Sequence, residues 1–395
     1  MIVKKALVAF SGGLDTSFCV PFLREKGYEV VTLTLNSGGF SEAELKDIEE
    51  RALKLGSIKH IALDVQEAMY DQIIRYQIMA NGLYQQSYPL MCSDRYLIAE
   101  KLSEYATKEN CEAVVTGNTG QGNDQVRIDV ALRILAPHLT NLAPIRDHSL
   151  TRDQEKKYLT DHGFEIPPKH TSYTKNQNIL GVTTSGSEID EVKEPKDETF
   201  ELTRLTQTGQ TYAEIEFKQG LPVSLNGKQL PGHEILKALN SLAGSHGFGR
   251  SHYIGDCVVG IKGAIWFEAP GILSLIKAHQ ALEQLVLTKR QRDQKASLDA
   301  IWAEMVFNGQ FYDPLVQDIQ AFLESNQKRV TGTVKLRFRQ NVCAAVEISS
   351  PCSLIDRKVA DYAQRASWTG EEAKAFIKLY GLQSVIASSK KPPKE

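Results

Sequence analysis

The chain has 395 residues, of which 42% are hydrophobic and 24% charged, a balance typical of a globular protein of about two or three domains. Its net charge of −2 argues against a protein whose main task is to bind nucleic acid. We find no signal peptide and no apolar run of membrane-spanning length, and therefore expect a cytoplasmic protein without a membrane partner. The six cysteines form no C-x-x-C pair, so we predict reduced thiols and no structural metal.

The first predicted strand, residues 6–10, leads into the heptapeptide Ser11-Gly12-Gly13-Leu14-Asp15-Thr16-Ser17, and a helical pattern follows it. Glycine lets the backbone approach an anion with its N–H groups turned inward, and the positive end of the helix dipole adds to the attraction. The motif matches neither of the two common phosphate-loop patterns. From Ser-Gly-Gly alone, an ordinary strand–turn–helix corner remains an alternative.

Strands and helices then alternate up to a predicted domain boundary near residue 165. We expect strands at 29–35, 60–65 and 112–116, and helices at 42–55, 66–81, 96–108 and 151–163. Such alternation predicts an α/β fold, a parallel doubly wound sheet with helices on both faces. Ligands bind such sheets at the carboxyl ends of the strands.

The strand at 112–116 leads into a second glycine-rich stretch, 117–127, which ends in Asn123, Asp124 and Arg127 at the start of a helix. Asp124 suits Mg²⁺ or a ligand amine, and Arg127 suits a carboxylate or phosphate. Alone, the stretch is more typical of a capped helix with a solvated arginine. Beside the first loop at the same sheet edge, we favour a binding site.

The second half of the chain mixes strands with helices and predicts an α+β domain. We expect strands at 211–217, 221–226, 253–261, 330–339 and 342–348, and helices at 233–244, 274–286, 293–306 and 315–327. The hydroxyl- and amide-rich stretch 171–186 is either a site for a polar substrate or a solvated loop. The last helix begins at Thr369 and carries one apolar stripe, which packs on a neighbouring subunit or on its own core.

Several motifs together resemble argininosuccinate synthase, in the superfamily of N-type ATP pyrophosphatases. They stand in that family's order along the chain: 9–17, 88–90, 119–127, 246–250, 260–262, 267–271 and 327–334. The resemblance implies a nucleotide-binding domain at 1–165, a synthetase and multimerisation domain at 166–365, an oligomerisation helix at 366–387 and a disordered tail at 388–395. It also implies a homotetramer and a C–N-forming ligase that uses ATP with Mg²⁺, citrulline and aspartate in arginine biosynthesis.

The resemblance also implies roles for individual residues, with Asp15 and Asp124 as the catalytic pair. ATP would contact the first loop, the end of the second strand and the second loop through Ala9, Phe10, Ser11, Gly12, Gly13, Leu14, Asp15, Thr16, Ser17, Leu35 and Gly117. Aspartate would contact Thr119, Asn123 and Asp124. Citrulline would contact Tyr88, Ser93, Asn123, Arg127, Thr174 and Thr183.

Two citrulline contacts of the family, a Glu and a Tyr, fall on Gly255 and Phe267 here. Either Asp256, Glu188 or Glu268 supplies the lost carboxylate, or the acceptor is a modified citrulline, for example an N-acylated one. The first account is favoured. Two other classes of protein are alternatives. One is an ATP pyrophosphatase that sulfurates tRNA or transfers an amide, but this chain lacks the paired cysteines that the first type needs and the glutaminase that the second needs. The other is a non-catalytic nucleotide-binding relative.

Overall fold

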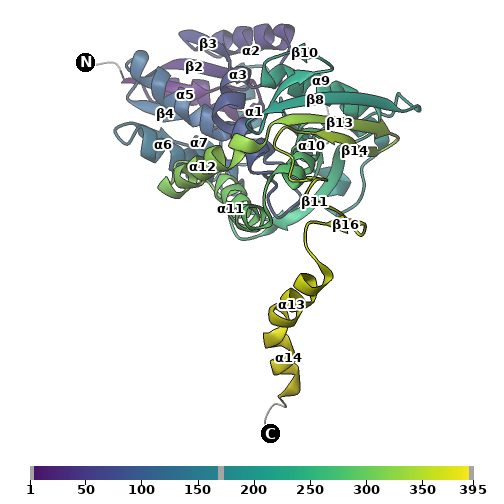
Figure 1. Ribbon diagram of the computed structural model, residues 1–395. Helices are drawn as coiled ribbons and strands as arrows, with labels where there is room; N and C mark the ends of the chain where they lie inside the picture. The colour runs from purple at the N-terminus through teal and green to yellow at the C-terminus, as the bar shows by residue number, and fades with distance from the viewer. Residues whose placement is uncertain (1–3, 168–172, 391–395) are drawn as a thin grey trace. The chain divides into compact units, whose positions relative to one another are not determined.

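The computed structural model describes residues 4–167 and 173–390. Two compact units divide the chain, Met1–Cys352 and Ser353–Glu395, and each is described by itself. Figure 1 labels the elements along the chain. No helix in the described ranges is long and apolar enough to cross a membrane.

A five-stranded sheet in the order β3-β2-β1-β4-β5 forms the first part of the fold. Its strands are β1 (Lys4–Ala9), β2 (Tyr28–Asn36), β3 (Lys59–Asp64), β4 (Ala113–Val115) and β5 (Thr140–Leu142). All neighbours pair in parallel. The order reverses between β1 and β4. Ligands of open parallel sheets bind beyond the carboxyl ends of the strands at such a position.

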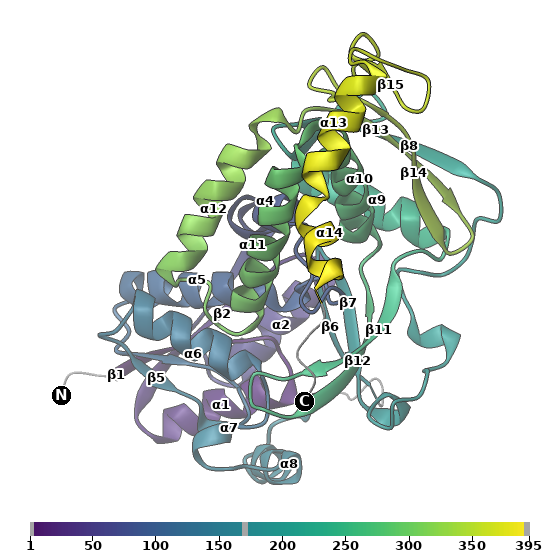
Figure 2. The ribbon, with the colours of Figure 1, turned by 60° about the horizontal axis from the view of Figure 1, so that its bottom comes forward.

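Helices cover both faces of this sheet, as predicted, because the strand side chains alternate in direction. On one face, Ala6 and Val8 pack with residues of α1 (Leu14–Glu25), α2 (Glu42–Lys54) and α8 (Arg152–Asp161). On the other face, Leu7 packs with residues of α5 (Asp94–Lys108) and α6 (Asp124–Leu135). Figure 2 shows α5 and α6 side by side.

The single helix predicted at 66–81 is interrupted. It consists of α3 (Gln66–Met69), a π-helical turn (Tyr70–Ile74) and α4 (Arg75–Met79). The short α7 (Pro144–Asp147) follows β5.

An antiparallel sheet in the order β10-β9-β8-β13-β14 forms the α+β part. Its strands are β8 (Thr211–Lys218), β9 (Leu221–Leu225), β10 (Lys228–Gln229), β13 (Gly332–Arg339) and β14 (Val342–Ser349). The helices of this part are α9 (Gly232–Ser245), α10 (Pro270–Val286), α11 (Lys289–Phe307) and α12 (Pro314–Asn326). In Figure 1, α10 lies against β13 and β14.

A third sheet, β11-β12-β7-β6, corrects two expectations. Its strands are β6 (Thr174–Asn178), β7 (Gly181–Ser185), β11 (Arg250–Asp256) and β12 (Lys262–Glu268). The stretch predicted as one strand at 253–261 is the end of β11 and a turn, because Gly260 adopts φ +84° and the Cys257 N–H donates to the Ile261 carbonyl at 2.8 Å. Much of 171–186, for which a loop was one alternative, is the hairpin β6–β7.

The second unit contains β15 (Ala360–Asp361), β16 (Arg365–Ala366), α13 (Gly370–Tyr380) and α14 (Leu382–Ser389). Thr369 and Glu372 form the expected capping box of α13. The predicted disordered tail at 388–395 is wrong at its start, because α14 continues through Ser389. Residues 391–395 lie outside the described residues.

Candidate active site

The loop between β1 and α1 has the geometry of an anion site. Gly12 adopts φ +73°, and Gly13, the N-cap residue of α1, has no side chain that could cap the helix. Among the described residues, no side chain accepts from the first N–H groups of α1. Within the loop, the Thr16 hydroxyl donates to the Gly13 carbonyl at 3.3 Å. A helix that leaves its first N–H groups uncapped behind a glycine turn favours a phosphate there.

The second glycine-rich loop lies directly against the first. A Cβ on Gly117 would lie 3.1 Å from Cβ of Asp15 and 3.2 Å from the Thr16 backbone nitrogen. Glycine therefore allows the loops after β4 and β1 to meet where the strand order reverses. Leu35 occupies the next-to-last position of β2, on the neighbouring strand of the same sheet.

Asp124, the first residue of α6, bridges two arginines. Its carboxylate accepts from Nε of Arg95 at 2.9 Å and from Nη1 of Arg127 at 2.8 Å. Burial opposes the charge, but the two guanidinium groups outweigh it and hold the pKa of Asp124 below its ordinary value. Arg127 also stacks on the Phe307 ring and donates to the Phe307 carbonyl at 2.8 Å. The three charged groups are thus held in a fixed arrangement.

Arg95 connects this arrangement to the neighbouring elements. It donates to Asp94 at 2.6 Å and to Asn176 of β6 at 3.4 Å. Asn123 lies beside Asp124, and its side-chain oxygen accepts from the Val258 N–H at 3.0 Å, in the turn between β11 and β12. The third sheet therefore reaches over the second glycine-rich loop; Figure 2 shows β11 and β12 beside β7 and β6.

Tyr88 lies in an aromatic cluster. Its ring contacts those of Tyr253, Phe267 and Phe307, with centroids 5.4, 6.0 and 5.9 Å away, and only 4% of the residue is exposed. Thr183 of β7 pairs in register with Phe267 of β12, which places it next to this cluster. Thr174 lies exposed at the start of β6 and pairs with Ser185, two residues after Thr183.

Buried polar groups without a partner mark the same edge of the sheet. Among the described residues, the hydroxyls of Ser17, Ser93 and Thr116 and the amide nitrogen of Asn118 are buried and have no hydrogen bond. Such groups are costly unless a ligand or water satisfies them. Ser17 and Ser93 are among the predicted site residues, and the other two flank Gly117. Thr119 lies in the same loop and is partly exposed.

Arg95 and Glu155 also lie at the candidate site, although no sequence motif marks either residue as part of it. Glu155 of α8 is 1% exposed, and its carboxyl group interacts with that of Asp15. Burial, and then the neighbouring Asp15 carboxylate, raises the pKa of Glu155 to about 8. Neither residue lies in a glycine-rich motif. The only sequence feature that points to Arg95 is its position directly after the loop that carries Tyr88.

The three carboxylates that could replace the family's Glu at Gly255 differ in the partners that they already have. Glu268 accepts hydrogen bonds from the N–H groups of residues 201–203, so its carboxylate is already occupied by backbone donors. Glu188 accepts from the Tyr173 hydroxyl at 2.6 Å. Asp256 accepts from Gln85 at 3.0 Å and from Lys262 at 2.5 Å, beside the loop that carries Tyr88. Of the three, Asp256 is the one attached to that loop.

Two family models and several known proteins match nearly the whole chain. The model of the argininosuccinate synthase N-terminal HUP domain matches residues 5–165, and that of the C-terminal domain matches 173–387. Argininosuccinate synthase of Xanthomonas campestris is 43% identical over 98% of both chains. The enzyme of Methanocaldococcus jannaschii is 38% identical over 98% of this chain and 99% of its own. A solved 4-thiouridine synthetase–RNA complex with bound ATP has a TM-score of 0.31 at 16% identity, covering 40% of this chain and 41% of its own.

The parallel sheet, the glycine turn where its strand order reverses and the first family model define a HUP-domain protein. The second family model and the relatives that match nearly the full length identify the family within this class. The chain belongs to the argininosuccinate synthase family.

Proposed function

We propose that this chain condenses L-citrulline with L-aspartate at the expense of ATP and releases argininosuccinate, AMP and pyrophosphate. The observation that supports the proposal is the contact of Gly117 with the start of α1, because the loop that leads from Gly117 to Asp124 and its two arginines begins against the glycine turn at Gly12 and Gly13. The ureido oxygen attacks the α-phosphorus and pyrophosphate leaves. The aspartate amine then attacks the ureido carbon and AMP leaves.

The enzyme's task in this reaction is to position reactants and stabilise charge, since adenylylation itself supplies the leaving group. The phosphates would lie on the loop 9–17, against the uncapped N-terminus of α1. Asp15 and the hydroxyls of Ser11, Thr16 and Ser17 are the hard oxygen donors that Mg²⁺ prefers, and the metal would neutralise phosphate charge there. Leu35 and Gly117 would border the nucleotide.

The amino-acid substrates would occupy the space above the second loop. Aspartate would contact Thr119, Asn123 and Asp124, and citrulline would contact Tyr88, Ser93, Asn123, Arg127, Thr174 and Thr183. The anchored Arg95 supports this assignment, because it adds a cation beside Asp124 for substrate carboxylates. Asp256, attached to Gln85, is the group we assign to the citrulline ammonium.

We further propose a homotetramer in the cytoplasm, with the predicted domain limits of 1–165, 166–365 and 366–387. The family models that end at 165 and begin at 173 support the first limit, whereas the compact units divide earlier than 366, after Cys352. Apolar side chains of α13 support the oligomer, since Ile377, Leu379 and Tyr380 are 68%, 70% and 81% exposed. Sedimentation of the full chain and of a chain ending at Ser367 tests this: a tetramer is expected only for the full chain.

The test of the reaction uses citrulline labelled with ¹⁸O in the ureido group. Pyrophosphate release from Mg-ATP is expected only with citrulline present, and the label is expected in AMP once aspartate is added. Label that stays out of AMP would contradict the adenylate. If N-acetylcitrulline supported faster pyrophosphate release than citrulline, the acceptor assigned here would be wrong.

A further inference from the structure

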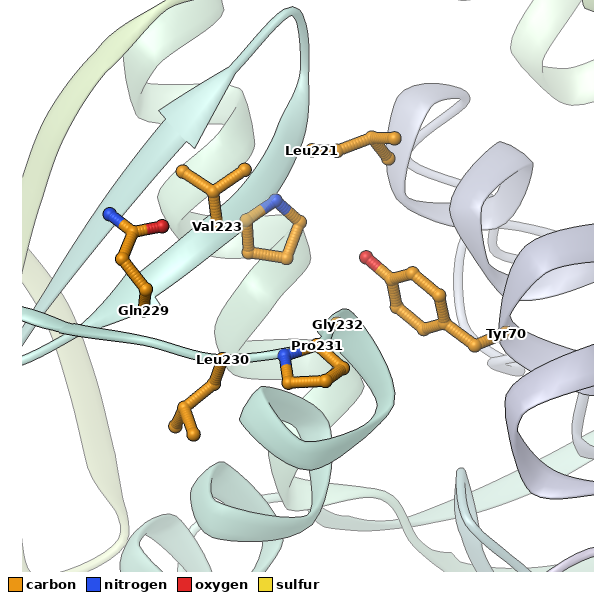
Figure 3. Close-up of a pocket in the computed structure, with 8 residues that line it drawn as sticks. Tyr70, Leu221, Val223, Gln229, Leu230, Pro231 and Gly232 are labelled. Atoms are coloured by element: carbon orange, nitrogen blue, oxygen red, sulfur yellow. The ribbon is translucent and has the colours of Figure 1, made fainter.

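A cavity of about 450 Å³ lies away from the glycine-rich loops, between the π-helical turn at Tyr70 and the β9–α9 region. Its apolar walls are Leu221, Pro222, Val223, Leu230 and Pro231, and Tyr70, Gln229 and Gly232 complete the lining. None of these eight lining residues is charged. In Figure 3 the Tyr70 hydroxyl points into the space between Val223 and Gly232.

The Tyr70 hydroxyl has no hydrogen-bond partner among the described residues, although only 6% of the residue is exposed. Burial raises the pKa of Tyr70, so the hydroxyl keeps its proton and remains a donor. An unsatisfied buried hydroxyl costs free energy unless something in the cavity accepts its hydrogen bond.

The start of α9 presents further donors at the same place. Its N-cap residue is Pro231, which has no side-chain acceptor, and Glu234 and Ile235 donate to the Pro231 carbonyl at 3.0 and 3.1 Å. The N–H groups of Gly232 and His233 have no acceptor in the described ranges. A Cβ on Gly232 would lie 2.1 Å from the Tyr70 hydroxyl oxygen, so only glycine lets the helix begin this close to it.

A helix N-terminus favours an anion, and here a buried, unpartnered hydroxyl points to the same spot. The acid closest in sequence to the start of α9, Glu234, pairs with Lys237 at 3.0 Å, which offsets its charge. On the opposite wall, Asp71 follows Tyr70 in the chain, and its charge at the Tyr70 hydroxyl is opposed by that of Arg75. A phosphate would call for cationic side chains, and the lining has none. A single carboxylate matches the few donors, and the apolar walls match a hydrocarbon body.

We propose that this cavity binds a small organic acid through its carboxylate, which accepts from the Tyr70 hydroxyl and the first N–H groups of α9, while an apolar body contacts the walls formed by Leu221, Val223 and Leu230. The site is separate from the proposed reaction. Because Tyr70 lies in the part matched by the N-terminal family model and α9 in the part matched by the C-terminal one, the ligand would bridge both.

Isothermal titration of the full chain with sodium hexanoate, without ATP or amino acids, tests the proposal independently of activity. Saturable one-to-one binding is expected, with hexanamide and acetate at least about tenfold weaker, because one lacks the charge and the other the apolar body. Tyr70→Phe is expected to weaken hexanoate about tenfold. Val223→Trp, which fills the cavity from the opposite wall, is expected to abolish binding.

Tyr70→Phe also has a readout in the free protein. Because it removes an unpartnered buried hydroxyl, its thermal unfolding midpoint is expected to equal or exceed that of the parent, and its pyrophosphate release is expected to be unchanged. Absence of saturable hexanoate binding, equal binding of hexanamide, or unaltered binding in Tyr70→Phe would each overturn the proposal.

Discussion

Tyr253 folds back along β11 over Gly255, so that a Cβ on Gly255 would lie only 1.8 Å from the Tyr253 hydroxyl oxygen. That hydroxyl donates to Gln85 at 2.9 Å, and Gln85 in turn donates to Asp256. The tyrosine thus occupies the space that any side chain at 255 would need, and its hydroxyl holds the loop that carries Tyr88.

Gly255→Ala is therefore expected to lower the free energy of unfolding by about 1–3 kcal/mol, the usual cost of an overfilled site. Urea unfolding measures this. In a Tyr253→Ala background the added cost of Gly255→Ala should nearly vanish, because the Tyr253 ring that would overlap with the new Cβ is absent. Tyr253→Phe is the control: it keeps the ring, whose Cζ would still be 2.0 Å from the new Cβ, so the cost should persist. Equal costs in all backgrounds would contradict the clash.

Asp124→Asn is expected to reduce kcat/KM for aspartate about a hundredfold, because it leaves Arg95 and Arg127 without their shared countercharge while keeping the side chain's shape. Steady-state argininosuccinate formation measures the loss. The matched control is Asp129→Asn, on the same helix, which breaks the ion pair with Arg146 at 2.5 Å. If both substitutions cost the same, the role assigned to Asp124 is wrong.

Glu155 makes stability depend on pH. Burial and Asp15 raise its pKa from 4.5 to about 8, so between these values the native state holds a proton that the unfolded chain has lost. The free energy of unfolding should therefore fall as pH rises through this window. Urea unfolding from pH 5 to 9 should show a flatter dependence for Glu155→Gln than for the parent. The exposed Glu194→Gln should keep the parental slope; a parental slope in Glu155→Gln would refute the assignment.

Lys295 is buried between two carboxylates, with Nζ 3.2 Å from Glu283 and 2.7 Å from Asp299. Burial, despite this lysine, raises the pKa of Asp299 to about 7. Lys295→Met should destabilise the fold by about 3–5 kcal/mol at pH 8, because both acids lose their cation, and by less at pH 5.5, where Asp299 is neutral. Lys101→Met, at a more exposed lysine paired with Glu100 and Glu104, should cost below about 1 kcal/mol.

The sequence by itself determined the parallel sheet, its helices on both faces, the glycine turn at Gly12 and Gly13 and the family. These features rest on local chemistry: period-two and period-3.6 apolar patterns, and glycines where the backbone must turn. The limits of the pattern appear after β11, where it predicts a continuous strand through the turn around Gly260.

Only the tertiary structure decided which charged groups meet. Asp124 joins Arg95, which is 29 positions away, and Glu155 joins Asp15 across 140 positions. Such pairings depend on how α5, α6 and α8 pack against the sheet, and no local pattern encodes them. The same holds for Tyr70 and Gly232, whose contact exists only because the π-helical turn and the start of α9 pack together.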